Sequence, residues 1–488
     1  MRENFTAAYE NLAKFGLEYF QIDDGYQVAH GDWNPDPARF PHGLKPVFEE
    51  MQSLGVKTGL WIRPFELAVN SQTYKKNPEW GLGWEESFPM KSKSHLPLDI
   101  SRPDVRRWLK HLFTKYRHYY NASWIKTDFT YNILGGKGFQ DKDMTAVEAM
   151  QEGFKLIRDV IGASTFLVGI GGPCQLHYGL VDAERVTLDV QPSWGKDGIM
   201  MPSEQGIKPN ARVIARRYYL HNRVWFTHCD VFQFREPLKP NEYLVQASII
   251  GLMGGVFKVG EKFINLNKHE FEIIGKLLPI YRPTGRGMRP LDILEKEYCE
   301  VWDLLVDDAA NGLGTYHVVG LFNWGENESL GTLIPEEVRE INASFHSMEL
   351  NVKKSYLIFE FWSETFKGIY STQYETKIEP RHHELVSIRE LRTHPQFMST
   401  NRHISQGATD IISYAWDEEL LMLTIESATV QEFEHHYHFH IPNEFSLLQA
   451  STSEEKLECK MQNDGCHLCI IYNGKQNEEK TISLEFIR

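Results

Sequence analysis

The sequence predicts a (β/α)8 barrel followed by antiparallel β-sandwich domains, and two observations lead to this fold class. Before residue 260, helical stretches of ten or more residues alternate with short, nearly continuous apolar runs, which is the pattern of βαβ units around a buried parallel sheet. From about residue 298, short strand candidates follow one another with turn residues between them, which is typical of antiparallel sandwiches. We therefore expect a catalytic barrel over 1–297 and β-sandwiches over 298–395 and 396–488, although the last two could form one domain.

Each predicted strand of the barrel segment is an apolar run bounded by a break in the pattern. Phe5, Ala8, Leu12 and Phe15 have helical spacing, and Gly16 ends this helix before the first strand. Further helices are predicted over 44–54, 103–120 and 144–160, and the seven predicted strands are 19–24, 56–62, 123–127, 165–170, 185–189, 223–229 and 254–259. A closed barrel has eight strands. Because the chain begins on a helix, we expect a barrel that lacks its first strand.

The sandwich region is predicted from apolar runs with β-branched and aromatic residues. These runs are 298–306, 316–322, 355–362, 385–388 and 420–425, with turn residues between them.

Composition excludes several classes of partner. The chain has 488 residues and a formal net charge of −14, whereas nucleic acids and anionic membrane surfaces bind basic patches. No run approaches the roughly 18 apolar residues of a membrane span. The six cysteines are too scattered for a disulfide framework, which favours a reducing compartment and predicts a cytoplasmic location. Neutral or cationic small substrates fit this composition. The composition is also compatible with a homo-oligomer.

A lysine and a carboxylate stand two residues apart at the end of the apolar run that starts at Trp124. On a strand, Lys126 and Asp128 point to the same face, so they would share one pocket wall. An ammonium beside a carboxylate favours its ionised form, which suits a nucleophile. Taken alone, a solvated strand end is the more common interpretation.

A second carboxylate, Asp189, follows Arg185 by four residues, so the two would share a face of a predicted strand. Cleaving a glycosidic bond needs one carboxylate to attack the anomeric carbon and one carboxylic acid to protonate the leaving oxygen. Asp128 and Asp189 could supply this pair, although an aspartate that caps the next segment is an equal alternative for Asp189.

Asp23 and Asp24 form an adjacent pair after the first predicted strand, and such acceptors suit two hydroxyls of a sugar. A solvated pair or a calcium ligand set is the alternative. Three tryptophans near strand ends could stack on a sugar ring, although a tryptophan at such a position is more often part of the core: Trp33, Trp61 and Trp194.

Histidines and cysteines near the C-terminus raise the question of zinc. His436, His438 and His440 would share one face of a strand, but a structural zinc site usually takes four ligands from two elements, so an ordinary half-exposed strand is preferred. Cys466 and Cys469 have CxxC spacing without a second such pair, which favours core thiols.

Six motifs in order resemble the bacterial α-galactosidases (melibiases) of glycoside hydrolase family 36. They are Tyr19–Gln27, Gly31–Trp33, Phe40–Lys45, Gly59–Pro64, Lys126–Asp128 and Gly179–Asp189. The likeness runs from residue 2 to about residue 295. It implies a retaining double displacement on the C-terminal face of a barrel, with an α-galactoside oligosaccharide as the substrate and with no metal and no organic cofactor.

The resemblance also implies a role for each matching residue. Asp128 is then the nucleophile and Asp189 the acid/base. The implied substrate-binding residues are Asp23 and Asp24 for the 4- and 6-hydroxyls of galactose, Lys126 for the 3- and 4-hydroxyls, Arg185 for hydroxyls near the reacting carbon, and Trp61, Arg63 and Cys174 in the pocket wall. Asp182 has no implied contact with the sugar and is expected to be structural.

Departures from the family pattern keep other functions open. Gly171–Cys174 stands where members of the family carry variable residues that contact the 2-substituent of the sugar. An α-N-acetylgalactosaminidase or a galactosyl transglycosidase is therefore an alternative. The family also has a β-sandwich before the barrel, and this sequence has neither that sandwich nor the first strand. A truncated, inactive sugar-binding fragment is therefore the alternative from another class.

Overall fold

The structure is a computed structural model that describes residues 1–195, 205–308, 311–325, 327–329, 332–334, 337–462 and 465–488. The chain divides into two compact units. The first unit comprises residues 1–5, 18–186 and 222–228, and the second comprises residues 6–17, 187–221 and 229–488. The predicted division into segments 1–297, 298–395 and 396–488 stays a prediction.

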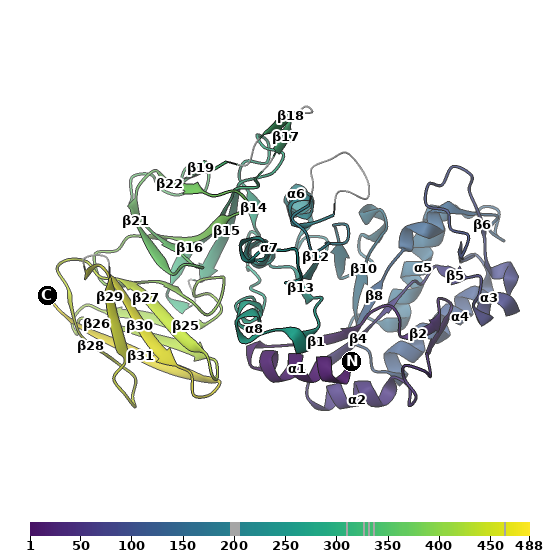
Figure 1. Cartoon of the computed structure of the whole chain (residues 1–488), viewed down its shortest axis with the longest axis horizontal. Coiled ribbons are helices and arrows are strands. Elements are labelled where there is room, and N and C mark those ends of the chain that lie inside the picture. Colours follow the sequence, from purple (N-terminus) through teal and green to yellow (C-terminus); the bar gives the residue numbers. More distant parts are fainter. Residues whose placement is uncertain (196–204, 309–310, 326, 330–331, 335–336, 463–464) are drawn as a thin grey trace. The chain divides into compact units, whose positions relative to one another are not determined.

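A seven-stranded sheet forms the centre of a barrel-type fold (Figure 1). Its strands follow in chain order: β1 (Tyr19–Ile22), β4 (Lys57–Ile62), β8 (Trp124–Thr127), β10 (Phe166–Gly169), β11 (Ala183–Arg185), β12 (Phe226–Phe232) and β13 (Val256–Val259). Neighbouring strands from β1 to β12 are parallel. The seven predicted strands and the barrel-type class are therefore confirmed. Two strand bounds were wrong, because β11 ends at Arg185 and β12 continues past Asp230.

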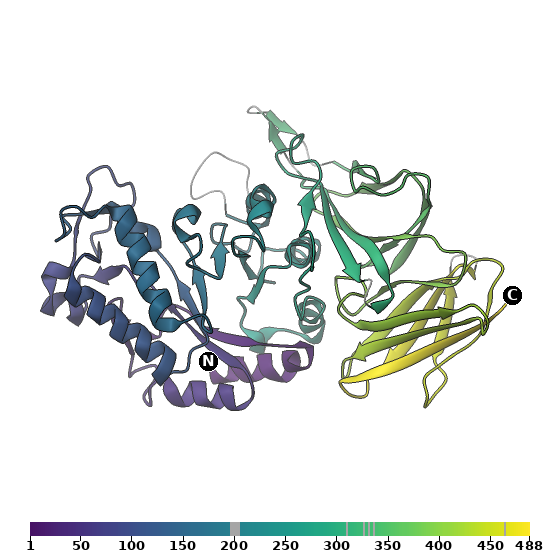
Figure 2. The ribbon, with the colours of Figure 1, turned by 180° about the vertical axis from the view of Figure 1, so that it is seen from behind.

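The strands of this sheet are apolar because both of their faces are covered. All four residues of β8 are buried, as are the last five of β4. The helices that follow are α2 (Lys45–Ser53), α4 (Pro103–Thr114) and α5 (Ala146–Ile161), and α4 and α5 lie side by side (Figure 2). Helices pack on both faces of such sheets, which explains the continuous hydrophobic runs.

Helix α5 shows how the sequence sets this packing. Thr145 caps its first turn together with Glu148, which is a capping box. One stripe of the helix is buried at three- and four-residue spacing, and within that stripe Gly153 faces Phe65. A Cβ atom at position 153 would lie 2.5 Å from the Phe65 ring, so only glycine allows this close approach.

Short elements of the first unit lie in the connections between the main strands. They are β2 (Gln27–Ala29), β3 (Asp32–Pro35), β5 (Glu66–Ala68), α3 (Gln72–Lys76), β6 (Gly83–Trp84), β7 (His95–Pro97) and β9 (Gly136–Lys137). The pairs β2–β3, β5–β7 and β6–β9 are antiparallel. These excursions follow the carboxyl ends of β1, β4 and β8, where a barrel carries its reactive residues.

The second unit contains helices and antiparallel sheets. Its helices are α6 (Ile207–Arg217), α7 (Pro240–Met253) and α8 (Lys268–Gly275), while α1 (Arg2–Leu12) starts in the first unit. One sheet has six strands, β14 (Arg289–Pro290), β15 (Val301–Asp308), β16 (Gly314–Phe322), β23 (His383–Glu390), β20 (Tyr356–Glu360) and β21 (Thr365–Tyr370). Two smaller pairs are β17 (Asn327–Ser329) with β18 (Thr332–Ile334) and β19 (Arg339–Ser344) with β22 (Gln373–Ile378).

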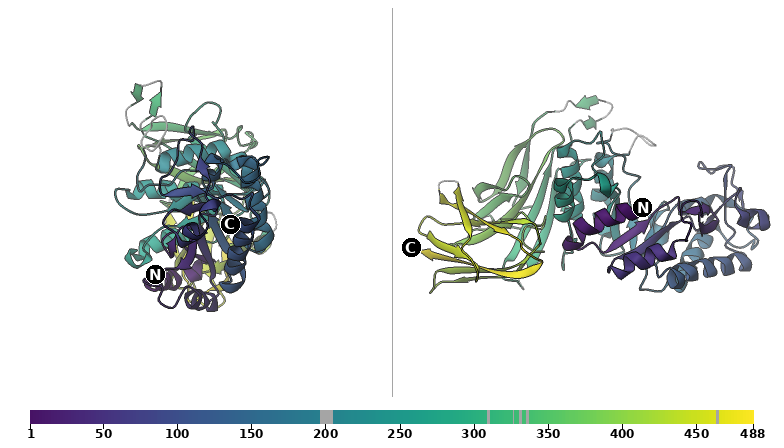
Figure 3. Two further views of the ribbon diagram at one scale, coloured as in Figure 1. Left: turned by 90° about the vertical axis from the view of Figure 1, so that its right-hand side faces the viewer. Right: turned by 60° about the horizontal axis from the view of Figure 1, so that its bottom comes forward.

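Two four-stranded antiparallel sheets face each other at the C-terminal end of the chain (Figure 3). One contains β24 (Gln396–Thr400), β27 (Glu434–His440), β30 (His467–Asn473) and β29 (Glu458–Gln462). The other contains β25 (Ile411–Asp417), β26 (Met422–Thr429), β31 (Glu478–Ile487) and β28 (Ser446–Ser451). Buried residues alternate along β26, as expected for a strand with one face in the core. The sandwich part of the predicted fold class is therefore confirmed.

Among the described residues, we find no helix with the length and apolarity that a membrane crossing requires.

Candidate active site

Polar residues follow the carboxyl ends of three neighbouring strands. Asp23 comes directly after β1, Arg63 after β4 and Asp128 after β8. The register of the parallel pairs places Trp61 opposite Lys126. Because parallel strands end at the same edge of the sheet, these side chains reach one face of the barrel.

Asp128 is held in a defined orientation by donors on both oxygens. The Phe129 N–H donates to its Oδ1 at 2.7 Å, and the Trp61 indole N–H donates to its Oδ2 at 3.2 Å. The Asp128 N–H continues the ladder by donating to the Ile62 carbonyl at 2.9 Å. The carboxylate is partly exposed, so it is accessible while its direction is fixed.

Gly171 leaves space next to this carboxylate. Its φ is +65°, a conformation that favours glycine, and a Cβ atom there would lie 3.3 Å from Asp128 Oδ1. Any side chain at position 171 would therefore be strained and would crowd Asp128.

Lys126 pairs with Asp23 at the neighbouring strand end. Its Nζ donates to Asp23 Oδ2 at 2.9 Å, and Gln21 Nε2 donates to the same oxygen at 2.7 Å. The lysine side chain is 10 % exposed, whereas that of Asp23 is 45 % exposed. The sequence placed Lys126 beside Asp128, but its ion pair is formed with Asp23, which joins β8 to β1.

Asp24 belongs to a second polar group, whose histidines were not predicted from the sequence. Gln27 Nε2 donates to its Oδ1 at 2.7 Å, and His30 Nε2 lies 3.1 Å from the same oxygen. The hydrogen bond with His30 holds the pKa of Asp24 below its ordinary value. His30 Nδ1 in turn lies 2.8 Å from His95 Nε2, and burial lowers the pKa of His95 to about 4. His30 and His95 come from separate connections, so no spacing in the sequence could have linked them.

Arg63 turns away from solvent into a buried network. Its Nε donates to Glu66 Oε2 at 2.7 Å, and Asn132 Nδ2 donates to Glu66 Oε1 at 2.6 Å. Burial raises the pKa of Glu66, even though Arg63 and Asn132 act to lower it. The guanidinium also lies 3.6 Å from the centre of the Phe129 ring. Arg63 therefore supports the Phe129 ring next to Asp128, and sequence reasoning missed the Glu66 and Asn132 of this buried network.

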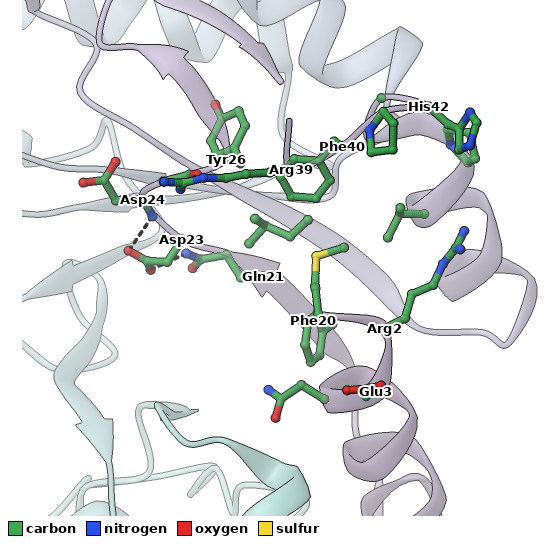
Figure 4. Close-up of a pocket in the computed structure, with 18 residues that line it drawn as sticks. Arg2, Glu3, Phe20, Gln21, Asp23, Asp24, Tyr26, Arg39, Phe40 and His42 are labelled. Atoms are coloured by element: carbon green, nitrogen blue, oxygen red, sulfur yellow. Dashed lines mark hydrogen bonds between the residues drawn. The ribbon is translucent and has the colours of Figure 1, made fainter. Parts of the chain in front are cut away.

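A surface pocket of about 810 Å³ lies along β1 and contains Asp23 and Asp24 at one end (Figure 4). Phe20, Phe40 and His42 lie further along it. This pocket is large enough for a sugar-sized ligand.

These residues fall in a segment with known relatives. Residues 2–157 match the family model described as Melibiase, and we call this stretch the melibiase segment. Within that match stand Asp23, Asp24, Trp61, Arg63, Lys126 and Asp128.

Two curated relatives resemble the melibiase segment. Alpha-galactosidase 2 of Pediococcus pentosaceus is 28 % identical over 172 residues, which cover 34 % of this chain and 23 % of that protein. Alpha-galactosidase C of Emericella nidulans is 30 % identical over 137 residues, which cover 24 % of this chain and 18 % of that protein. The matched part thus spans less than a quarter of the length of either relative, and the similarity to α-galactosidases concerns that part alone.

A solved structure supports the fold. A GH27 β-L-arabinopyranosidase from Geobacillus stearothermophilus, in complex with arabinose, covers 80 % of this chain and 94 % of its own with a TM-score of 0.61 and 14 % identity. At that identity the likeness concerns the fold alone, a barrel-type sheet with antiparallel sheets at the C-terminus.

Three predicted site residues lie beyond the melibiase segment. Cys174 starts a short helical turn and is half-buried, and Arg185 is the half-buried last residue of β11. Asp189 is exposed and belongs to the second unit. The prediction that Arg185 and Asp189 share a strand face was wrong, because sheet pairing continues only to the Val186 N–H, which donates to the His228 carbonyl. The roles of all three residues stay predictions.

Asp182 has a structural role. Arg158 pairs with its carboxylate at 2.6 Å, and the Leu167 N–H donates to it at 2.7 Å. This aspartate links α5 to the start of β10, as expected for a residue without a contact to the sugar.

Proposed function

We propose that the chain is a retaining exo-acting glycoside hydrolase that releases terminal α-linked galactose from oligosaccharides or glycoconjugates. The observation that carries this proposal is the oriented carboxylate of Asp128, which stands beside the Lys126–Asp23 ion pair inside the melibiase segment. The similarity of that segment to α-galactosidases supports galactose as the sugar.

The polar groups near Asp128 have the chemistry to bind the sugar. Asp23 and Asp24 present carboxylate acceptors that are about half exposed, and Lys126 presents an ammonium donor beside them. Sugar hydroxyls donate and accept hydrogen bonds, so this set can hold adjacent hydroxyls of galactose. Trp61 and Phe129 orient Asp128, which limits the attack to one direction.

The reaction then proceeds in two displacements. In the first, Asp128 attacks the anomeric carbon while the carboxylic acid of Asp189 gives its proton to the leaving glycosidic oxygen, so a covalent galactosyl-enzyme forms and the aglycone leaves. In the second, the Asp189 carboxylate takes a proton from water, and the resulting hydroxide attacks the same carbon and frees Asp128. Two inversions give galactose with net retention. This scheme requires the two carboxyl groups to lie about 5 to 5.5 Å apart during reaction.

The test uses 4-nitrophenyl α-galactoside and the full chain. We expect turnover by the unmodified protein, loss of at least about a thousand-fold in Asp128→Ala, and partial recovery with sodium azide, which would yield galactosyl azide of inverted configuration. Asp159→Ala is the matched control, because Asp159 is an exposed aspartate on α5. Sugar binding without turnover in the unmodified protein would instead support the sugar-binding fragment.

The preference between sugars is tested with the same protein. The ratio of kcat/KM for the α-galactoside and the α-N-acetylgalactosaminide reports which 2-substituent is accepted, and galactosyl products formed with an added acceptor sugar report transfer. We expect hydrolysis of the galactoside to dominate.

A further inference from the structure

A group of metal-binding side chains lies in the second unit, on the sheet formed by β24, β27, β30 and β29. His436 and His438 are two residues apart on β27, so both point to the same face. Cys469 on β30 is the register partner of His438. One imidazole nitrogen of each histidine and the Cys469 sulfur all lie within 4.8 Å of one another.

Glu364 adds a carboxylate to this group from a different part of the chain. It stands in the turn between β20 and β21, and its Oε2 lies 2.6 Å from His436 Nδ1 and 3.1 Å from His438 Nε2. A single carboxylate oxygen therefore lies close to both imidazole nitrogens. The four side chains come from three separate elements. A structural zinc site usually takes four ligands from at least two elements, a condition that the histidines of β27 alone do not meet.

The opposite nitrogen of each histidine also has a partner. Glu434 Oε1 lies 2.9 Å from His436 Nε2, and His467 Nε2 lies 3.0 Å from His438 Nδ1. Histidines that bind metals are typically oriented in this way through their second nitrogen. The rings are thus set with Nδ1 of His436 and Nε2 of His438 toward the same point.

The surroundings keep bulk water from most of the group. The side chain of His438 is 3 % exposed, and Cys469 is buried, while His436 and Glu364 are 22 % and 26 % exposed. Phe359 packs on the His438 ring with a centroid distance of 4.6 Å. The partly exposed side gives an ion a path of entry.

The donor set and its spacing fit one class of ion. Zinc binds nitrogen and oxygen at about 2.0 to 2.2 Å and sulfur at about 2.3 Å in a tetrahedron, which separates neighbouring donor atoms by about 3.3 to 3.6 Å. Glu364 Oε2 now lies 2.6 and 3.1 Å from the two imidazole nitrogens, and the histidine nitrogens and the Cys469 sulfur lie within 4.8 Å of one another, so binding an ion requires the side chains to rotate to that spacing. Two neutral imidazoles, one thiolate and one carboxylate also balance the charge of a divalent ion. Magnesium and calcium prefer oxygen ligands and do not match this set.

We propose that Glu364, His436, His438 and Cys469 form a structural zinc site that fixes the β20–β21 turn to the C-terminal sheet. Four protein ligands leave no open position for substrate, so the site stabilises the fold and takes no part in hydrolysis. His440 is outside it, since its ring faces Phe366 with a centroid distance of 5.8 Å. The proposal is independent of the hydrolase function.

Cobalt is the first probe, because tetrahedral Co²⁺ is coloured and reports its ligands. The full chain is treated with a chelator, dialysed and titrated with CoCl2. We expect one Co²⁺ per chain, ligand-field absorption typical of a tetrahedral site and a sulfur-to-metal charge-transfer band in the near ultraviolet. Stoichiometric ZnCl2 should bleach these bands and raise the thermal midpoint by about 5 °C.

Variants decide whether these four residues are the ligands. Cys469→Ser should abolish the charge-transfer band, and Glu364→Gln should keep that band but weaken Zn²⁺ binding at least ten-fold. Cys466→Ser is the matched control and should behave as the unmodified protein. Glu364→Gln leaves the β-strands unchanged, so it is informative even if Cys469→Ser does not fold. A chain that binds no Co²⁺, or whose binding is unaffected by both ligand variants, would overturn the site.

Discussion

Trp61 orients Asp128 through its side chain, because its indole N–H donates to one carboxylate oxygen while the Phe129 backbone N–H donates to the other. We expect Trp61→Phe to lower kcat on an α-galactoside by about ten-fold, equivalent to about 1.4 kcal/mol, with little change in KM. Steady-state kinetics check this. Trp33→Phe is a matched control, because Trp33 is also buried but its indole N–H has no acceptor among the described residues. Equal effects of both changes would contradict a special role for the Trp61 hydrogen bond.

Glu66 is a second residue whose contribution can be measured, because its side chain is 0 % exposed and holds the buried Arg63. Glu66→Gln would leave the guanidinium buried without its carboxylate, so we expect a loss of about 3 kcal/mol in the free energy of unfolding. Urea denaturation followed by tryptophan fluorescence gives this value. Glu49→Gln, which breaks an exposed pair with Lys45, should change stability by less than about 1 kcal/mol. An unchanged free energy of unfolding in Glu66→Gln would contradict this prediction and would show that water solvates the Arg63 guanidinium in the variant.

At the level of elements, the start of α5 is set by its capping box. The Thr145 hydroxyl accepts from the Glu148 N–H at 3.2 Å, and the Glu148 carboxylate accepts from the Thr145 N–H at 2.9 Å. Thr145→Ala should cost about 1 kcal/mol of stability, measured by urea denaturation. Thr114→Ala at the end of α4 removes a hydroxyl that only donates to the Lys110 carbonyl, and it should cost less than half as much. An equal loss in both variants would argue against the cap.

The strands of the barrel could be predicted from the sequence because of how they are buried. Strands buried on both faces are continuous apolar runs, so β4 and β8 were found within one residue of their observed bounds. The strand predicted over 185–189 was placed too late in the chain, because the alternating pattern continues past Arg185, where β11 ends. Local pattern carries no information about where a neighbouring strand stops.

Predicting the site from the sequence had a similar limit. Asp23, Lys126 and Asp128 were identified because each stands at or just beyond an apolar run. The partners Glu66, Asn132, His30 and His95 lie in connections, and only the folded chain brings them to the strand ends. Likewise, Glu364 is distant in sequence from the histidines of β27, so the spacing of those histidines by itself suggested an ordinary strand.

At the level of the whole molecule, acid should destabilise the protein through histidines that are buried in the neutral form. Burial lowers the pKa of His383, His403 and His435 to about 3, and that of His221 and His467 to about 4, whereas the unfolded chain binds protons near 6.5. Their contribution is therefore complete above about pH 6.5 and is lost as the pH falls toward 4. Although burial acts to lower it, the bonds to Glu364 raise the pKa of His436, so this one group acts in the opposite direction.

We expect the free energy of unfolding to fall between pH 7.5 and 5, with each buried histidine contributing at most about 1.4 kcal/mol per pH unit. Urea denaturation at several pH values measures this slope. His435→Gln keeps an acceptor for the Val430 N–H and should flatten the slope, whereas His346→Gln, at an exposed position, should not. Stability that is constant or rises on acidification would contradict the prediction.

The conformation at Gly171 has a consequence for how this protein can diversify. A positive φ and a Cβ position 3.3 Å from Asp128 together mean that even alanine would be penalised twice there. Substitutions around Asp128 are therefore expected to accumulate at neighbouring positions rather than at Gly171. A mutational library built around Asp128 would recover most of its folded survivors with glycine retained at position 171.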